Sequence, residues 1–198
     1  MVSFSLEEPL GRLLERIASA EPGPAGGSVA ALAVAMSAGL VAMAARLARD
    51  WPQANEVVER ADVLRTLATS LAVADAEAYA RVLEAQRLPR GSGERQAEID
   101  AALSPAADVP LALAEAASEV ATLAALVAQA GSAHVRGDAV VAAEIAEAGA
   151  RCAAELVVIN LGDRDDARVR RAKALAAKTL EGARLGAGAP GSQAAPPA

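Results

Sequence analysis

The carboxylate with the most unusual surroundings is Asp75, which lies in a stretch of alanine and valine at residues 72–76. Burial of a carboxyl group among apolar side chains disfavours its charged form and raises its pKa. A carboxyl group of raised pKa can take up and release protons near neutral pH, as a general acid or base does. The sequence therefore makes Asp75 a candidate for proton transfer.

A second carboxylate, Asp138, directly follows a glycine-containing stretch at residues 131–137, and we expect it to begin a helix. The role of an N-cap accounts for it, because aspartate accepts hydrogen bonds from the first free amides of a helix. An aspartate at a helix start beside such a loop could also face a ligand. Asn160, at the end of the same expected helix, either caps that helix or reaches a ligand. His134 is expected in the loop, where exposure to solvent is its ordinary explanation and proton transfer a second one.

A proline- and glycine-rich turn, PGPAGGS at residues 22–28, precedes an apolar helical stretch. Proline lacks an amide donor and glycine has high backbone entropy, so no helix continues through this turn. Free amides and small side chains at the start of the next helix could hold a carboxylate or a flat polar ring. The turn lacks the lysine and serine or threonine that end a phosphate-binding loop, so nucleotide binding is not expected. An ordinary turn between helices explains these residues as well.

Histidine and cysteine are too few for the common metal centres. The chain has one His and one Cys, whereas a di-iron bundle needs Glu-x-x-His motifs and a hydrolytic zinc site needs several His or Cys ligands. We predict no catalytic metal and no cofactor. Cys152 is expected to be a buried small apolar side chain, and a lone cysteine forms no internal disulfide.

The composition predicts closely packed helices. Hydrophobic residues make up 54% of the chain but aromatic residues only 2%, and most of the apolar content is alanine, the strongest helix former. The valines stand among alanines at helical spacing, without the alternation typical of strands. Six helices are expected, at about residues 5–20, 28–49, 53–88, 94–130, 138–161 and 164–185. Gly27 or Ser28 is expected to cap the second of these helices.

Two local patterns refine these helices. Ser5 and Glu8 form a predicted capping box, in which their side chains accept hydrogen bonds from free amides at the start of the first helix. Pro105 and Pro110 fall inside the fourth helix and predict a kink or a short break there.

These elements predict an all-α, up-and-down bundle of about six helices. One domain is expected at residues 1–185, followed by a disordered tail, GAGAPGSQAAPPA, at residues 186–198. Helix faces rich in alanine are thin and bury little area each, so pairing with a second copy would add much stability. We therefore predict a homodimer.

Charge and length exclude several partners and locations. The formal net charge is −6 and the pI is about 4.9, so neither nucleic acid nor an anionic membrane surface is an expected partner. Residues 29–45 are uncharged, but a bilayer span takes about 20 apolar residues, and this shorter stretch is interrupted by Ser37 and Gly39. We therefore predict no membrane insertion. Residues 1–20 lack the pattern of a secretory signal, and a cytoplasmic protein is expected.

Three stretches, in this order, resemble the cyclodeaminase/cyclohydrolase family of one-carbon folate enzymes. The first is PAGGS at residues 24–28 with the alanine-rich run after it, similar to Pro-Gly-Gly-Gly-Ser in the family. The second is DAEAY at residues 75–79, followed by a Leu-Pro pair and a Val-Pro-Leu run. The third is GDAVVAA at residues 137–143 with VVINL at residues 157–161, similar to Ser-Asp-x-x-Val-Ala and Asn-Val-x-Ile-Asn-Leu. The resemblance covers roughly residues 5–185, and its specificity comes from the ordered set.

The resemblance implies an all-helical dimer that binds a reduced folate near the glycine-rich turn. It implies chemistry at the carbon that bridges N5 and N10 of tetrahydrofolate, with proton transfers that carboxylates can make without a metal. On this hypothesis the catalytic carboxylates are Asp75, as the proton carrier, and Asp138, and the substrate contacts are Gly26, Gly27, Ser28, Asn160 and Arg46. Arg46 would meet the anionic glutamate tail of the folate, although ending an apolar helix is its ordinary role.

Two reactions fit the resemblance. One is hydrolysis of 5,10-methenyltetrahydrofolate, and the other is cyclodeamination of 5-formiminotetrahydrofolate, in which N10 attacks the amidine carbon and ammonia leaves. The absence of an attached transferase domain weakly favours the hydrolase. The chain departs from the family pattern at Ala25, Gly137 and Leu156, where the family has Gly, Ser and Asn. A helical bundle that binds folate or a protein partner without catalysis is therefore the alternative hypothesis.

Overall fold

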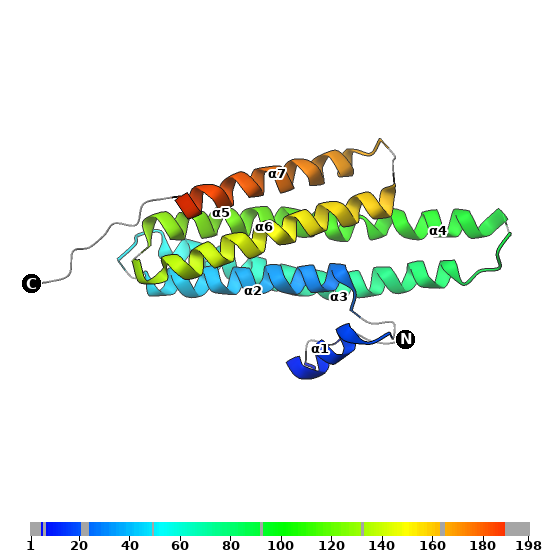
Figure 1. Cartoon of the computed structure of the whole chain (residues 1–198), viewed down its shortest axis with the longest axis horizontal. Coiled ribbons are helices and arrows are strands. Elements are labelled where there is room, and N and C mark those ends of the chain that lie inside the picture. The colour runs from blue at the N-terminus through cyan, green and yellow to red at the C-terminus, as the bar shows by residue number, and fades with distance from the viewer. Residues whose placement is uncertain are drawn as a thin grey trace, which may run out of the picture.

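The structure is a computed structural model that describes residues 5, 7–20, 24–48, 50–91, 93–131, 133–162 and 165–188, with side chains up to residue 184 (Figure 1). Within these residues the chain forms helices and no strand. The helices are α1 (Leu10–Ala18), α2 (Gly26–Leu47), α3 (Ala54–Gln86), α4 (Gly93–Ala106), α5 (Asp108–Ala130), α6 (Ala133–Leu161) and α7 (Ala167–Gly188).

The predicted all-α bundle is confirmed. α4 and α5 are the two halves of the stretch that the sequence places at residues 94–130, and they meet at Ala107, between the two prolines. Pro110 has no amide hydrogen, so it cannot continue the hydrogen-bond ladder of the preceding helix. With these halves taken as one interrupted helix, the described part of the chain has the six predicted helices.

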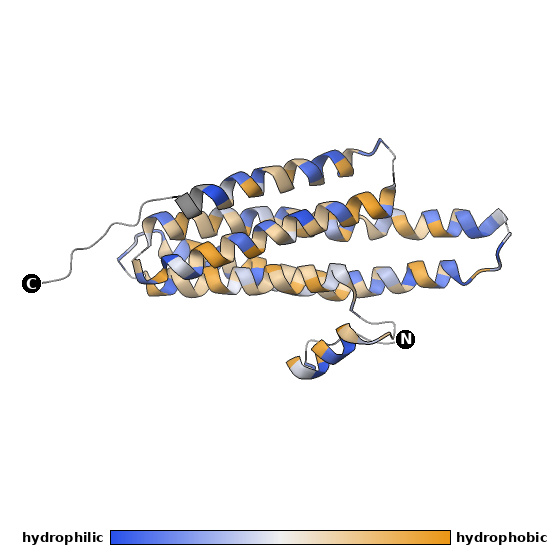
Figure 2. Ribbon diagram, in the orientation of Figure 1, coloured by the Kyte–Doolittle hydropathy of each residue, from blue (hydrophilic) through white to orange (hydrophobic). Residues whose placement is uncertain are grey.

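α2 lies between α3 and α6 in the bundle, and α7 lies over α5 and α6 (Figure 1). Ser28 near the start of α2 bonds Ala72, whereas Arg46 near its end pairs with Asp62, so α2 and α3 run in opposite directions. α3 and α4 extend beyond the other helices as a hairpin. Hydrophilic residues gather on α7 and on the outer end of this hairpin, whereas α2 is largely hydrophobic (Figure 2).

The contact between α2 and α6 is close because small residues face it. Val34 of α2 is fully buried, and a Cβ added at Gly149 of α6 would lie 2.4 Å from one of its methyl carbons. The buried Ser37 hydroxyl donates to the carbonyl oxygen of Ala142 at 2.6 Å, which satisfies it without water. The main core consists largely of alanine and valine, so the helix backbones approach closely.

The first helix starts later than predicted. α1 begins directly after Pro9, whose fixed φ and missing amide hydrogen suit a helix start. The predicted capping box does not form: the Ser5 hydroxyl oxygen accepts the amide hydrogen of Glu7, and the Glu8 carboxylate pairs with Arg16.

The loop expected at residues 131–137 is mostly helical. α6 already covers most of it, so His134 lies in the first turn of a helix, where it is exposed. Asp138 lies in the second turn, and its predicted role as the N-cap is wrong. Gly137 costs a helix about 0.5–1 kcal/mol relative to alanine, but burial of Val135 against the core favours the longer helix.

The last helix runs further than predicted, to Gly188. Residues 186–188 of the expected tail therefore belong to α7, and residues 189–198 lie outside the described residues. The single domain at residues 1–185 stays a prediction. Cys152 is exposed on α6, contrary to its expected burial.

Two helical stretches, Gly26–Leu47 and Gly93–Ala130, are long and apolar enough to cross a membrane. In each of them 61% of the apolar window is buried inside the bundle, as it is in core helices of soluble proteins. The expectation that the chain does not insert into a membrane stays a prediction.

The close contact at Gly149 gives a test of the packing. Gly149→Ala should lower the free energy of unfolding by about 1–3 kcal/mol, because the new methyl group overlaps Val34 in a filled core. In the Val34→Ala background the same substitution should cost less, since the overlapping methyl group is gone. Denaturant unfolding of the two single variants and the double variant measures this coupling, and strictly additive effects would contradict the contact.

Candidate functional site

The candidate site lies at the end of the bundle where α2 begins. Here the Ser28 hydroxyl oxygen lies 2.9 Å from Asp75 Oδ2 and 2.9 Å from the carbonyl oxygen of Ala72. Ser28 is fully buried and Asp75 is half-buried. The structure thus brings the predicted proton carrier into contact with Gly27 and Ser28, two of the predicted substrate contacts.

Gly27 allows this contact because it has no side chain. A Cβ added at Gly27 would lie 2.0 Å from Oδ1 and 2.5 Å from Cγ of Asp75, so the carboxylate occupies the space that any other residue would fill. Gly26 differs, since nothing lies within 4 Å of an added Cβ there. Of these two glycines, only Gly27 is required by the packing of Asp75.

Asp75 also supplies a cap for α2. The N-cap residue of α2 is Ala25, which makes no side-chain capping hydrogen bond. Both the backbone and the side chain of Ser28 are hydrogen-bonded to the Asp75 carboxyl group instead, so the cap comes from another helix. The expectation that Gly27 or Ser28 is the cap is wrong, because both lie inside α2. The partial positive charge of a helix start favours a carboxylate here.

Burial raises the pKa of Asp75 above its ordinary value of 3.8, and the hydrogen bonds from Ser28 oppose part of this rise. The Ser28 hydroxyl has one hydrogen, so it cannot donate to Asp75 and to Ala72 at once. When it donates to the Ala72 carbonyl, a proton on Asp75 can complete the contact between Asp75 and Ser28. Both protonation states of Asp75 therefore have hydrogen-bond partners, which suits a group that carries protons.

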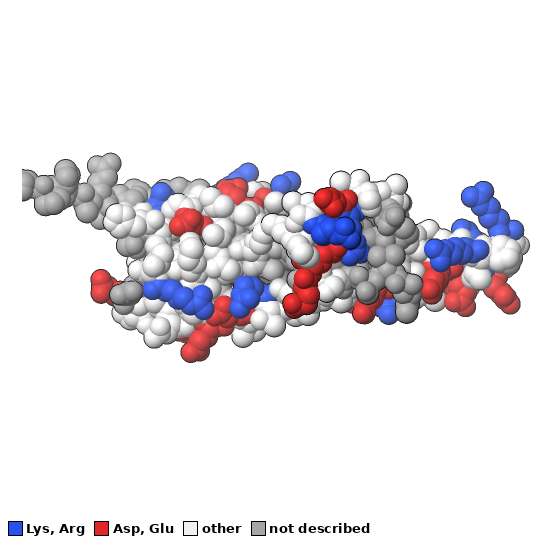
Figure 3. Space-filling view, turned by 90° about the horizontal axis from the view of Figure 1, so that it is seen from below, with Lys and Arg blue, Asp and Glu red and all other residues white. Residues whose placement is uncertain are grey.

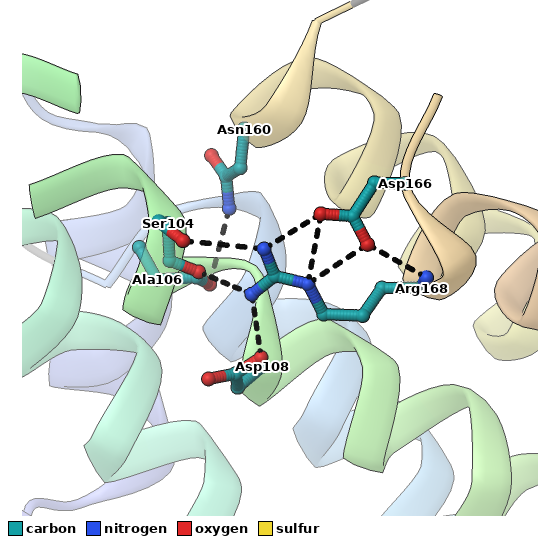
Figure 4. Close-up of polar contacts among 6 residues, drawn as sticks. All are labelled: Ser104, Ala106, Asp108, Asn160, Asp166 and Arg168. Atoms are coloured by element: carbon teal, nitrogen blue, oxygen red, sulfur yellow. Dashed lines mark hydrogen bonds and ion pairs between the residues drawn. The ribbon is translucent and has the colours of Figure 1, made fainter. Parts of the chain in front are cut away.

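The second part of the site lies at the break between α4 and α5. In a continuous helix the Ala106 carbonyl would accept the amide hydrogen of residue 110, but Pro110 has none. The side-chain amide of Asn160 in α6 donates to this carbonyl at 3.1 Å (Figure 4). Its Oδ1 points away from the contact and accepts no hydrogen bond within the described residues. Asn160 therefore caps a broken helix and still offers an acceptor to a ligand.

A small apolar cluster connects the two parts. Ala78, Val82 and Ala106 are buried against one another. Ala78 lies about one helical turn after Asp75, and Ala106 carries the carbonyl that Asn160 bonds. The Asp75 contact and the Asn160 contact thus lie at the same end of the bundle.

Tyr79 is a further candidate contact that the carboxylates and glycines alone do not reveal. It follows Asp75 by four residues, which places both side chains on one face of α3. Tyr79 is the one tyrosine of the chain, and its side chain is 43% exposed. An exposed aromatic ring one turn from a half-buried carboxylate is the signal that identifies it.

Asp138 lies away from this end of the bundle. Ser37 of α2 is opposite Ala142 of α6, and Asp138 lies one turn before Ala142. At about 1.5 Å per residue along a helix, Asp138 is therefore about 20 Å along the bundle from Ser28. Within one chain the two predicted catalytic carboxylates do not meet.

Arg46 lies at the same far end, in the last turn of α2. Its exposed guanidinium group pairs with Asp62 of α3. Along the helix axis it is about 27 Å from Ser28, at about 1.5 Å per residue. Within one chain Arg46 therefore lies far from the contact between Ser28 and Asp75.

The departures from the family pattern have modest structural effects. Ala25 has φ −101° and ψ −168°, an extended backbone that any residue adopts, so alanine causes no strain there. An added Cβ at Gly137 would meet open space. Leu156 is half-buried on α6, and nothing else in its surroundings distinguishes it.

A groove of about 870 Å³ lies elsewhere, between α3 and α5, and its lining includes Trp51, Arg60, Glu119 and Leu126. An ion pair between Arg60 and Glu119 crosses it. None of the predicted site residues lines this groove. The chemistry at the start of α2, rather than the volume of the groove, identifies the candidate site.

Known proteins resemble this chain along most of its length. A family model described as formiminotransferase-cyclodeaminase matches residues 9–179. Methenyltetrahydrofolate cyclohydrolase from Methylorubrum extorquens is 36% identical over 193 residues, which cover 92% of this chain and 91% of that protein. Formimidoyltransferase-cyclodeaminase from Sus scrofa is 33% identical over 172 residues, which cover 81% of this chain and 32% of that protein.

A solved structure shares the fold. The crystal structure of formiminotetrahydrofolate cyclodeaminase from Thermotoga maritima matches with a TM-score of 0.81 and 23% identity. The match covers 91% of this chain and 94% of that chain. The bundle described above is therefore a known architecture.

Substitution of Gly27 tests the contact between Asp75 and α2. Gly27→Ala should lower the free energy of unfolding by about 1–3 kcal/mol, because the new methyl group displaces the Asp75 carboxyl group and leaves the start of α2 without its cap. The activity should fall at least about 100-fold, since a displaced carboxylate no longer transfers protons. Gly182→Ala is the matched control, as an added Cβ meets open space there. Full activity of Gly27→Ala in steady-state assays would show that the Asp75 position is unimportant.

Proposed function

Because this chain belongs to the formiminotransferase-cyclodeaminase family, we propose that its reaction is the hydrolysis of 5,10-methenyltetrahydrofolate. It is a one-carbon folate enzyme of the cyclohydrolase or cyclodeaminase type. The choice of the hydrolase is supported by the relative from M. extorquens, which matches over 91% of its own length, against 32% for the relative from S. scrofa. The observation that carries the proposal is the half-buried Asp75 carboxyl group of raised pKa at the start of α2.

Asp75 would transfer the protons of this reaction. Water adds to the bridging carbon of the methenyl cation, and the charged carboxylate takes a proton from the attacking water. The bond from that carbon to one ring nitrogen then breaks, and Asp75 returns its proton to that nitrogen. The cation and water give a neutral formyl product and one released proton, which leaves the carboxylate ready for the next cycle.

The surroundings of Asp75 suit a flat cationic ligand. A carboxylate close to the cationic carbon stabilises its charge. Gly26 leaves open space at the first turn of α2, where backbone amides can meet a polar ring. Asn160 Oδ1 would accept a hydrogen bond from the donor edge of the pterin, and the exposed Tyr79 ring would stack on its face.

Two other functions are supported by particular observations. Cyclodeamination of the formimino substrate forms the same tetrahedral carbon, and the relative from S. scrofa favours it. A bundle that binds folate without turnover is the alternative based on Ala25 and Leu156. The backbone at position 25 is extended, so alanine fits there without strain. The departure at Ala25 is therefore a weak argument against catalysis, and this favours an active enzyme.

A homodimer through α2 is supported by a stripe of exposed apolar side chains. Val29, Met36, Met43 and Leu47 are 39%, 64%, 38% and 56% exposed. They recur after seven, seven and four residues, so they share one face of α2. Apolar side chains at this spacing are typical of a helix that packs against another helix. Large areas of the molecular face in Figure 3 are also uncharged.

An antiparallel pairing of two α2 helices would complete the site. A two-fold axis near the middle of α2 places the end of one helix beside the start of the other. Asp138 of the partner subunit and Arg46 of the partner subunit would then approach the level of Ser28 and Asp75. This arrangement accounts for the separation of the predicted site residues within one chain.

The proposed enzyme works without a cofactor and takes a reduced folate as its small-molecule partner. Acid–base chemistry by carboxylates is sufficient for the reaction. Within the described ranges no three His, Cys, Asp or Glu side chains converge as metal ligands. Acidic and basic side chains are interspersed on the face in Figure 3, and mixed charge of this kind does not favour binding of nucleic acid or an anionic membrane there.

A spectrophotometric assay of the purified chain tests the reaction. With 5,10-methenyltetrahydrofolate, the methenyl absorption band should decay faster than in buffer alone, because Asp75 assists the attack of water. Appearance of that band from 5-formiminotetrahydrofolate would instead identify the cyclodeaminase. Stoichiometric folate binding without a change of the band in either assay would select the non-catalytic bundle and contradict the proposal.

Mixing two inactive variants tests whether the site spans two subunits. Asp75→Asn should lower turnover at least about 100-fold, and Asp138→Asn should lower it at least about tenfold. After unfolding and refolding together, half of the dimers carry one variant of each kind, and one of the two sites in such a dimer is intact. About a quarter of the wild-type activity should therefore return. A purely monomeric mass at micromolar concentration, or no recovery of activity, would contradict the shared site.

A further inference from the structure

Arg168 of α7 holds the broken turn between α4 and α5. Its guanidinium group donates to the carbonyl oxygen of Ser104 at 2.8 Å and to the Ser104 hydroxyl at 3.2 Å (Figure 4). It also pairs with Asp108 at the start of α5 and with Asp166, both at 2.8 Å. One side chain thus joins the last turn of α4, the first turn of α5 and the start of α7.

This contact replaces part of the helical hydrogen bonding that is lost at the break. From the backbone, the Ser104 carbonyl oxygen accepts only a long hydrogen bond of 3.3 Å from the Ala107 amide. The Arg168 guanidinium donates a second and shorter hydrogen bond to the same oxygen. Two residues further on, the Ala106 carbonyl accepts a hydrogen bond from the side-chain amide of Asn160. Neighbouring carbonyls of one irregular turn are therefore held by two side chains from α6 and α7.

Arg168 has no donor left for a ligand. A guanidinium group has five N–H donors. The bonds to Ser104, Asp108 and Asp166 use them all. The hydrogen bonds from Arg168 lower the pKa of Asp166 to about 2, so this pair persists until the pH falls toward that value. Arg168 is consequently a fixed structural group at neutral pH.

The orientation of Asn160 depends on this turn. A backbone carbonyl only accepts hydrogen bonds, so Ala106 fixes the NH₂ group of Asn160 against it and turns Oδ1 away. If the turn moved, the amide could rotate and present a donor where the acceptor now lies. The geometry of residues 104–108 therefore decides which polar atom of Asn160 a ligand meets.

We propose that Arg168 is a positioning residue for substrate recognition, which holds residues 104–108 so that Asn160 presents its carbonyl oxygen to the donor edge of the substrate. This inference rests on the proposed folate function. Arg168 acts on binding through Asn160 and touches neither the substrate nor Asp75.

The test compares Arg168→Gln with Arg171→Gln. Arg171 also joins α7 to α5, through an ion pair with Glu115 at 2.6 Å, but it does not contact the broken turn. Arg168→Gln should raise KM at least about tenfold, the effect of one lost hydrogen bond to a ligand, with a much smaller change in kcat. Arg171→Gln should leave both constants unchanged. Arg168→Lys keeps the charge but cannot bridge all three partners, so it should not restore KM.

A double variant separates positioning from general weakening of the fold. If Arg168 acts through Asn160, the KM of Arg168→Gln/Asn160→Ala should equal that of Asn160→Ala alone. Independent effects that multiply would overturn the proposal, as would an unchanged KM in Arg168→Gln. Should Arg168→Gln not fold by circular dichroism, Arg168→Lys takes its place in the same cycle.

A measurement without substrate decides the positioning even if the folate function is wrong. The side-chain amide of Asn160 is identified in a ¹H–¹⁵N spectrum by its loss in Asn160→Ala. In the wild type its two protons should have distinct shifts and slow exchange, and in Arg168→Gln they should move toward the values of a free amide. Identical Asn160 signals in both proteins would overturn the proposal. Absence of turnover by the wild type would instead overturn the proposed function alone.

Discussion

The contact of the Asp75 carboxyl group with the first turn of α2 is the interaction on which the rest of the site depends. It requires a position without a side chain, and Gly27 provides it, since an added Cβ would lie 2.0 Å from Oδ1. It requires a donor, and the buried Ser28 provides it. In return the carboxyl group caps a helix whose own N-cap is alanine. One contact thus joins two helices and places an acid–base group of raised pKa at the end of the bundle.

The second half of the site follows the same physical rule, that a backbone group without a helical partner must find another one. The free amides at the start of α2 meet Asp75, and the carbonyl freed by Pro110 meets Asn160. Side chains that form hydrogen bonds with such backbone groups are held in one orientation, because the backbone groups belong to rigid helices. A ligand site built from them is therefore ordered before the ligand arrives.

The sequence was sufficient for the helices, for the break near Pro110 and for the apolar surroundings of Asp75, because these depend on local composition and spacing. It misplaced the start of α6, since packing of that helix against the core outweighed the propensity of Gly137. The cap of α2 by Asp75 joins residues 47 apart and the Asn160 contact joins residues 54 apart, so neither follows from local pattern. The distance of Asp138 and Arg46 from Ser28 depends on antiparallel packing of long helices, which motifs do not report.

The most direct test is a titration of the Asp75 carboxyl carbon by NMR in the wild-type protein. We predict a midpoint above 3.8, because burial favours the protonated form more than Ser28 favours the charged one. A raised midpoint also means that Asp75 adds stability at pH below 3.8 and loses this contribution as the pH rises through the folded-state value. A midpoint at or below 3.8 would show that Asp75 is an ordinary helix cap, and the proposed proton carrier would be absent.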